Sequence, residues 1–300
     1  MSDVIAGVDA GGTKTTAALC VDGQEVSRVV AAGGALRPGR VLAAAAVIAD
    51  AARRALASAG RLTADVLVVG AAGAGRDGPR EELRAALHSE RLASRLHITT
   101  DIELKLVAGF DDGPGIVLAA GTGSIAVARA ADGTLWRSGG YGWQLGDEGS
   151  GYAIGRAALG AVGRAHDGRG PATVLSERIL AGARVAGFDE LVGWAGRAGP
   201  TEVAALARVV LEAAGDGDAV AAAVVDEAAA HLAELVTSLL RRMDEPTDVP
   251  VALAGSLLIT GPVLKDRLLA RLAGEPRLKV VAAPIDPVLG AFRIGRRMIG

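Results

Sequence analysis

Residues 7–16 read GVDAGGTKTT, and residues 118–127 repeat the same pattern as LAAGTGSIAV. In each segment an apolar strand leads into a glycine turn that carries hydroxyl groups, and a second alternating strand follows. Glycine lets the backbone turn tightly and approach a ligand closely. Successive backbone N–H groups in such a turn form a concave anion site. The two turns therefore predict two lobes that bind one polyphosphate.

Two other glycine motifs must be excluded first. A P-loop requires Gly-Lys-Ser/Thr followed by a helix, whereas GGTKTT at 11–16 continues as a strand. GTGSIA at 121–126 matches the dinucleotide fingerprint G-x-G-x-x-A, but that fingerprint must open a helix. The residues after it alternate as a strand. The turns thus belong to strand–turn–strand units.

Composition restricts the class of protein. The chain has 300 residues, enough for two domains, and is 50% hydrophobic but only 3% aromatic, so its core must consist of Ala, Val, Leu and Ile. The net charge of −2 gives no field that would attract nucleic acid or a membrane. The single cysteine, Cys20, excludes an internal disulfide and lies in an apolar run that predicts a buried thiol. The N-terminus lacks the pattern of a signal peptide, so we expect a cytoplasmic protein.

The first part of the chain alternates strands and helices. The Asp-Gly pair at 22–23 between two apolar runs predicts a hairpin. Strands followed by alternating helices favour a mixed α/β sheet. The predicted strands are 3–9, 15–21, 24–31, 66–69 and 96–100, and the predicted helices are about 40–59, 80–93 and 102–109.

A turn-rich segment at 111–115 predicts the domain boundary, after which the pattern restarts. The expected elements are strands 115–120, 124–130 and 134–138, a helical region 150–243 with breaks at 168–171, 187 and 199–200, strand 249–254, and helices 262–273 and 287–299. We expect the last helix to return to the first lobe. The predicted lobes are 1–112 with 288–300, and 113–287.

Asp9 and Lys14 flank the first turn. An acid beside bound phosphates can hold Mg²⁺, through water because Mg²⁺ dehydrates reluctantly. The alternative for Asp9 is a turn-forming residue that bonds to its own backbone. Lys14 is either a ligand of phosphate oxygens or a solvated strand residue.

Asp101 follows a short strand and begins a helix. It is a candidate general base for a substrate hydroxyl, since phosphoryl transfer needs an acceptor for the attacking hydroxyl's proton. Asp is also a favoured N-cap residue. The local pattern leaves both interpretations open.

The segment 139–151, GGYGWQLGDEGSG, is too rich in glycine for core structure and indicates a pocket lined by backbone. Asp147 can accept hydrogen bonds from paired sugar hydroxyls, and Tyr141 can face a sugar ring. The segment can also contain the capped start of a helix near 149–150, where Asp147 and Glu148 complement the helix dipole, and the two interpretations are compatible. The small-residue turn at 253–257 would let a flat base or a ribose approach the backbone.

Together these segments resemble the N-acetylglucosamine kinase and BadF/BadG/BcrA/BcrD-type ATPase group of the actin/hexokinase/Hsp70-like superfamily. The resemblance runs from residue 5 to about 258. It rests most specifically on the run from the paired glycines at 139–140 to Gly-Asp-Glu-Gly-Ser at 146–150. It implies an α/β fold of two duplicated ribonuclease-H-like lobes, the actin-like ATPase arrangement, with ATP and Mg²⁺ in a central cleft.

The resemblance also implies residue roles. Asp101 would activate the 6-hydroxyl of an amino sugar, and Asp9 would hold Mg²⁺. The residues implied in ATP and phosphate binding are Gly11, Gly12, Thr13, Lys14, Gly121, Thr122, Gly123, Gly255 and Ser256. The residues implied in sugar binding are Gly140, Tyr141, Gly142 and Asp147. The implied enzyme is a hexosamine kinase, a homodimer that acts on a small sugar and binds neither nucleic acid nor membranes.

One departure concerns the acceptor. Members that bind N-acetylglucosamine carry an Asn after the third strand and another after the Gly-Thr-Gly-Ser turn. This chain has 34–37, GALR, and Ile125 at these places. Arg37 is either a partner for a carboxylate, as in N-acetylmuramate, or a solvated side chain. N-acetylglucosamine, glucosamine and N-acetylmuramate therefore all remain candidate acceptors.

Two other functions remain possible. A BadF-type ATPase that drives a redox partner would need cysteines for an iron–sulfur cluster, and Cys20 alone does not provide them. A non-catalytic sugar sensor of related groups would carry a DNA-binding helix-turn-helix, for which the first strand, starting by residue 4, leaves no room.

Overall fold

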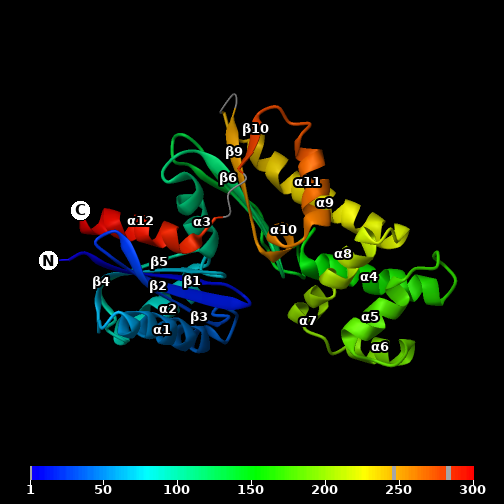
Figure 1. The fold of residues 1–300 in the computed structure, drawn as a ribbon, viewed down its shortest axis with the longest axis horizontal. Coiled ribbons are helices and arrows are strands. Elements are labelled where there is room, and N and C mark those ends of the chain that lie inside the picture. Colours follow the sequence, from blue (N-terminus) through cyan, green and yellow to red (C-terminus); the bar gives the residue numbers. More distant parts are fainter. Residues whose placement is uncertain (1, 245–247, 282–284) are drawn as a thin grey trace. The chain divides into compact units, whose positions relative to one another are not determined.

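The computed structural model describes residues 2–244, 248–281 and 285–300. The chain divides into two compact units, Met1–Gly113 with Ile285–Gly300, and Pro114–Pro284. Each unit contains a five-stranded sheet with helices packed against it (Figure 1). The expected α/β class is confirmed.

The first sheet begins with the predicted strand–turn–strand unit. Its strands are β1 (Val4–Ala10), β2 (Lys14–Val21), β3 (Gln24–Ala32), β4 (Ala64–Ala71) and β5 (Ala93–Thr99). Their order is β3-β2-β1-β4-β5. The first three strands are antiparallel, whereas β4 and β5 run parallel to β1. The central position of β1 explains why nearly all its residues are buried.

Four helices cover the two faces of this sheet. Helices α1 (Val41–Ser58) and α2 (Asp77–Ser89) bury alanine and leucine side chains on one face. Helices α3 (Asp101–Phe110) and α12 (Pro287–Ile299) pack together on the other face (Figure 1). The C-terminal helix therefore completes the core of the first unit.

The second sheet repeats the topology of the first. Its strands are β6 (Gly115–Ala120), β7 (Ser124–Arg129), β8 (Leu135–Gly139), β9 (Val249–Ala254) and β10 (Leu278–Val281). The order is β10-β9-β6-β7-β8, which matches the first sheet when β6 is aligned with β1. The duplication inferred from the two glycine turns is thus a duplication of whole sheets.

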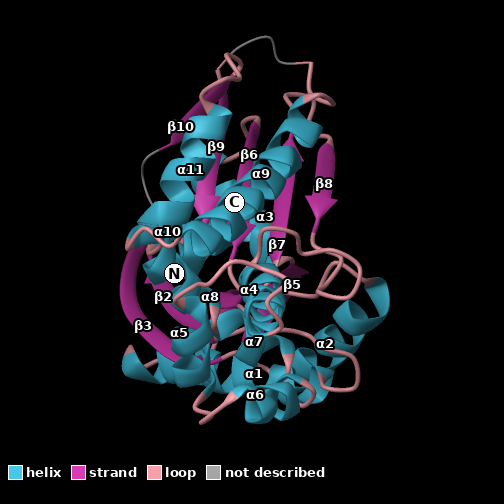
Figure 2. Cartoon of the chain, turned by 90° about the vertical axis from the view of Figure 1, so that its right-hand side faces the viewer, coloured by secondary structure: helices cyan, strands magenta, loops and turns pink. Residues whose placement is uncertain are grey.

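The second unit carries more helices than the first. They are α4 (Gly151–His166), α5 (Leu175–Ala183), α6 (Phe188–Ala195), α7 (Pro200–Ala205), α8 (Ala207–Gly215), α9 (Ala219–Leu240), α10 (Ser256–Ile259) and α11 (Pro262–Leu272). Helix α9 lies along β6, β7 and β8, and α11 packs beside it (Figure 2). Leucine and valine side chains from these helices and from one face of the sheet form one large core cluster.

Most predicted elements are confirmed with small shifts at their ends, and β10 and α10 are additional. The helical region 150–243 consists of six helices, and the expected breaks lie between α4 and α5, before α6 and before α7. In the part of the chain that the structure describes, no helix combines the length and the apolar character needed to cross a bilayer.

Candidate functional site

The first glycine turn joins β1 to β2. The N–H of Gly11 donates to the carbonyl of Lys14 over 3.0 Å and closes the turn. Gly12, Thr13 and Lys14 are all exposed. This turn is therefore a backbone-rich loop open to a ligand, as an anion site requires.

Asp9 lies at the end of β1, directly before this turn. Its Oδ1 atom is buried and has no hydrogen-bond partner among the described residues. Burial raises the pKa of Asp9 from 3.8 to about 6; nearby Lys105 and Lys14 oppose this rise, and Asp101 adds to it. An orphaned buried carboxylate oxygen is unusual in a native structure and calls for a partner.

A divalent cation fits this oxygen. Mg²⁺ is typically bound by one or two carboxylates together with substrate phosphates and water. Within residues 2–244, 248–281 and 285–300, no three His, Cys, Asp or Glu side chains form a cluster that could hold a metal ion.

Helix α3 begins with Thr100 as its N-cap, and Asp101 is its first residue. The Thr100 side chain accepts a hydrogen bond from the Glu103 N–H over 3.2 Å, and the Glu103 carboxylate accepts one from the Thr100 N–H over 3.3 Å. This capping box satisfies the start of the helix. The alternative interpretation of Asp101 as the N-cap is therefore wrong, because Thr100 has that role. The Asp101 carboxylate is not used in capping the helix.

The partner of Asp101 is Lys105, one helical turn later, which the sequence analysis missed. The Lys105 ammonium lies 2.8 Å from Asp101 Oδ2 and 3.2 Å from the Asp101 carbonyl oxygen. The two side chains are only 13% and 25% exposed, respectively. Burial lowers the pKa of Lys105, but Asp101 and Asp9 outweigh it and raise the pKa above its ordinary value. Helical spacing, which places residues i and i+4 on one face, would have found this pair.

The second glycine turn joins β6 to β7 and is tied to the start of α4. The Gly121 N–H donates to the Gly123 carbonyl over 2.9 Å. The Gly151 N–H donates to the Gly121 carbonyl over 2.8 Å, and the Tyr152 N–H to the Thr122 carbonyl over 3.2 Å. The first turn of α4 therefore fixes this loop through hydrogen bonds to its carbonyl oxygens.

Asp147 joins the glycine-rich segment to the same turn. It is only 8% exposed, and its carboxylate accepts a hydrogen bond from the Ser124 N–H over 3.4 Å and one from the Gly142 backbone. Burial raises its pKa, and these two hydrogen bonds counteract the rise. The N-cap of α4 is Ser150, which accepts from the Ala153 N–H over 3.2 Å. Asp147 thus has a structural partner in addition to its predicted contact with a sugar.

Tyr141 is far more open to solvent. It is 57% exposed, and the guanidinium of Arg137 lies 4.7 Å from the centre of its ring. Gly140 and Gly142, on either side of it, are partly exposed. Tyr141 therefore lies against Arg137 and still exposes surface that is accessible to a ligand.

Gly255 and Ser256 follow β9 and adjoin the second turn. Gly255 has a φ of 86°, and a Cβ atom there would lie 2.2 Å from the Ala120 carbonyl oxygen. Only glycine allows the two backbones to approach so closely. The end of β6, the start of α4 and this turn therefore meet around residues 121–123.

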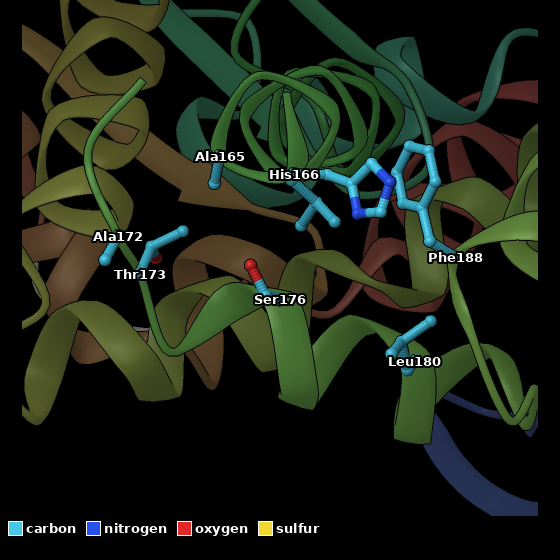
Figure 3. A pocket seen from close by; sticks show the side chains of 8 residues that line it. Ala165, His166, Ala172, Thr173, Ser176, Leu180 and Phe188 are labelled. Carbon is cyan, nitrogen blue, oxygen red and sulfur yellow. The ribbon is translucent and has the colours of Figure 1, made fainter. Parts of the chain in front are cut away.

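A cavity that sequence analysis did not predict lies between α4, α5 and the start of α6. Its volume is about 350 Å³, and none of the predicted site residues lines it. The rings of His166 and Phe188 stack at 3.9 Å along its edge, and the Ser176 hydroxyl points into it (Figure 3). Its lining is largely apolar.

The predicted residues thus form two groups. In the first unit, Asp9 interacts electrostatically with Asp101 and with Lys14. Residues 121–123, Asp147 and residues 255–256 lie together in the second unit. Cys20 is buried in β2, as expected.

Comparisons with known proteins point to one family. The sequence matches the BadF/BadG/BcrA/BcrD ATPase family over residues 6–295. It is 32% identical to the N-acetylmuramic acid/N-acetylglucosamine kinase of Clostridium acetobutylicum over 234 residues, which is 77% of this chain and 76% of that protein.

The fold agrees with solved structures. A candidate N-acetylglucosamine kinase from Chromobacterium violaceum superposes with a TM-score of 0.81 at 28% identity, covering 98% of this chain and 99% of the other. A ROK hexokinase from Thermus thermophilus superposes with a TM-score of 0.59 at 18% identity over the full length of both chains. The second match supports the actin-like ATPase fold alone.

Proposed function

This chain belongs to the BadF/BadG/BcrA/BcrD ATPase family, and we propose that it is an ATP-dependent sugar kinase that phosphorylates the 6-hydroxyl of an amino sugar. The candidate acceptors are N-acetylglucosamine and its close relatives glucosamine and N-acetylmuramate. The similarity to a kinase of N-acetylmuramic acid and N-acetylglucosamine supports the substrate class.

The observation that carries the proposal is the arrangement of Asp101 and Asp9 in the first unit. The two carboxylates influence one another electrostatically beside the glycine turn, and Lys105 holds Asp101 in place. Phosphoryl transfer requires little more of a protein than a positioned base and positioned phosphates. These residues are of the types that such a reaction needs.

Asp101 is the proposed base. Its carboxylate accepts the proton of the sugar hydroxyl while the hydroxyl oxygen bonds to the γ-phosphorus of ATP. The bond between that phosphorus and the bridging oxygen breaks, and the electron pair leaves with ADP. The products are ADP and a sugar 6-phosphate. The hydrogen bond from Lys105 keeps the carboxylate in one orientation for this transfer.

The glycine turns are the proposed phosphate ligands. Gly11, Gly12 and Thr13 present backbone N–H groups, and Lys14 adds a positive charge. Residues 121–123 supply a second such turn, and residues 255–256 border the adenosine. Gly140, Tyr141, Gly142 and Asp147 form the proposed sugar contacts.

Asp9 is the proposed residue for Mg²⁺. Its unpartnered Oδ1 supports this role. When bound, the ion would neutralise charge that develops on the transferring phosphate. Burial raises the pKa of Asp9 to about 6 because the charged carboxylate is costly to bury. A cation beside it would offset much of that cost.

A panel of hexosamines incubated with ATP and Mg²⁺ tests the proposal, with phosphorylated products detected by mass spectrometry. We expect a gain of one phosphate on at least one N-acetylated hexosamine. Asp101→Asn, which keeps the size of the side chain but not its basicity, should lower kcat by about 10²–10⁴. Thermal melting of both proteins checks that the variant is folded. An absence of phosphorylated product from every hexosamine would refute the function, and full activity in Asp101→Asn would refute the assigned base.

A further inference from the structure

A second cavity lies beside the first glycine turn, within the first unit. Its volume is about 260 Å³. It is lined by Gly12, Gly33, Ala35, Arg37, Arg40, Ala43, Ala44 and Val47. These residues come from the turn, from the loop after β3 and from the first turns of α1.

The loop after β3 is fixed against the turn. The Ala35 N–H donates to the Gly11 carbonyl over 3.1 Å, and the Leu36 N–H donates to the Ala72 carbonyl over 2.8 Å. A Cβ atom at Gly33 would lie 2.3 Å from the Gly12 carbonyl oxygen, so glycine is required for this contact. Arg37 therefore has a defined place next to the residues proposed to bind phosphate.

The cavity is electropositive. Arg37 and Arg40 line it, and none of the acidic residues that the structure describes does. Both arginines are exposed, and among the described residues neither guanidinium forms an ion pair. Helix α1 begins next to the cavity with Arg40 as its N-cap and no acidic residue in its first turn. The positive end of the helix dipole thus adds to the two guanidinium charges.

The remaining lining is apolar. Ala35, Ala43, Ala44 and Val47 supply methyl groups. Phosphate already has a proposed ligand in the backbone N–H groups of the glycine turn itself. Two arginines beside methyl groups suit a carboxylate on a short alkyl substituent, because guanidinium groups pair with carboxylates in a two-pronged geometry.

We propose that this cavity is the subsite for a carboxylate-bearing substituent of the acceptor sugar, and that Arg37 and Arg40 select for such acidic sugars. This inference rests on the proposed function, because it treats the neighbouring turn as part of a sugar kinase site. N-acetylmuramate has the required chemistry, since its lactyl ether carries one carboxylate and one methyl group. N-acetylglucosamine is the matched neutral acceptor that lacks this substituent.

The test is the ratio of kcat/KM for N-acetylmuramate to kcat/KM for N-acetylglucosamine, with the KM for ATP measured in parallel. The variants are Arg37→Met, Arg40→Met and the double substitution. Methionine keeps an unbranched apolar stem but removes the guanidinium. Arg61→Met, which removes an exposed arginine of the same unit outside the cavity, is the control. Thermal melting confirms that each variant is folded.

We expect the double substitution to lower the ratio at least about tenfold, the scale of one charged hydrogen bond. Arg37→Lys, which retains a charge, should lower it less than Arg37→Met, and Arg61→Met should leave it unchanged.

An equal loss for both sugars would overturn the inference, and so would a rise confined to the KM for ATP, which would assign the cavity to phosphate. A native enzyme that phosphorylates N-acetylglucosamine but not N-acetylmuramate would also overturn it and leave the proposed function intact. If the enzyme phosphorylates neither of these sugars and no other hexosamine, the proposed function itself is refuted.

Discussion

The ammonium of Lys105 lies 2.8 Å from the Oδ2 atom of Asp101, and both side chains are largely buried on the same face of α3. The same ammonium also interacts electrostatically with Asp9. One cation therefore stabilises two carboxylates that would otherwise repel one another. This relationship links the proposed base to the proposed metal ligand and leads to the first two predictions.

Lys105→Met should lower kcat about tenfold or more and should have a smaller effect on the KM for ATP. The substitution removes the hydrogen bond that orients Asp101, and a misplaced catalytic group costs rate rather than nucleotide affinity. It should also destabilise the protein by about 1–3 kcal/mol, because it leaves buried charges without a partner. Steady-state kinetics and urea denaturation measure the two effects. Lys279→Met, at an exposed lysine of β10, is the control. Native kcat in Lys105→Met would rule out the positioning role.

Asp9→Asn should stabilise the nucleotide-free protein at high pH and abolish Mg²⁺-dependent ATP binding. The pKa of Asp9 in the folded protein, about 6, lies above the ordinary value of 3.8. The folded state therefore binds this proton more tightly. The associated stability is complete below pH 3.8 and is lost as the pH rises through about 6. The difference corresponds to at most roughly 3 kcal/mol.

Thermal melting in the presence of EDTA, at about pH 4 and about pH 8, tests this sign. The variant should melt above the native protein at the higher pH and close to it at the lower pH. If the melting temperatures of variant and native protein differ equally at both pH values, ionisation of Asp9 is not the cause of the difference.

Thr100→Ala should destabilise the protein by about 1 kcal/mol, because the N–H of Glu103 loses its capping partner. Thr100→Ser retains the hydroxyl and should remain near the native stability. Urea denaturation of the two variants provides the comparison. If both lose the same stability, the methyl group rather than the cap is responsible.

Asp147→Ala should lower the melting temperature in addition to weakening sugar binding. The backbone N–H groups of Ser124 and Gly142 lose their acceptor, at a cost of about 1–3 kcal/mol. Asp147→Asn keeps an acceptor oxygen and tolerates the positive φ of 63° at this position, so it should be milder. A raised sugar KM with native melting in Asp147→Ala would mean that this residue acts only on the sugar.

The strand–turn–strand units could be predicted because their signals are local. Alternating apolar residues, a glycine turn and an Asp-Gly hairpin follow one another within thirty residues or so in each half. The bounds of β6, β9 and α12 agree with the sequence analysis to the residue. β6 and β9 are short, nearly continuous apolar runs, and the buried residues of α12 repeat with a helical period.

The elements that sequence analysis missed are very short, or no glycine or proline marks their ends. Strand β10 and helix α10 have four residues each, too few for a period to show. The division between α7 and α8 falls at Leu206, without a glycine or proline to mark it. Such breaks are set by packing in the second unit and not by local propensity.

The candidate site was predictable by residue type but not by partner. The sequence pointed to Asp9, Asp101 and Asp147, yet left each with two interpretations. The structure shows that Thr100, not Asp101, is the N-cap of α3. It also shows that Asp147 accepts a hydrogen bond from the Ser124 N–H, 23 residues away in the chain. The cavity that Arg37 shares with Arg40 depends on a backbone contact between Gly33 and Gly12, which no local pattern reveals.

The most direct test of the central claim is the phosphorus NMR spectrum of the product formed from N-acetylglucosamine and ATP with Mg²⁺. Phosphorylation of the 6-hydroxyl predicts a new phosphomonoester signal coupled to the two protons on C6, formed by the native protein and strongly reduced with Asp101→Asn. A signal coupled to a single ring proton, or formation at the native rate in Asp101→Asn, would contradict the account.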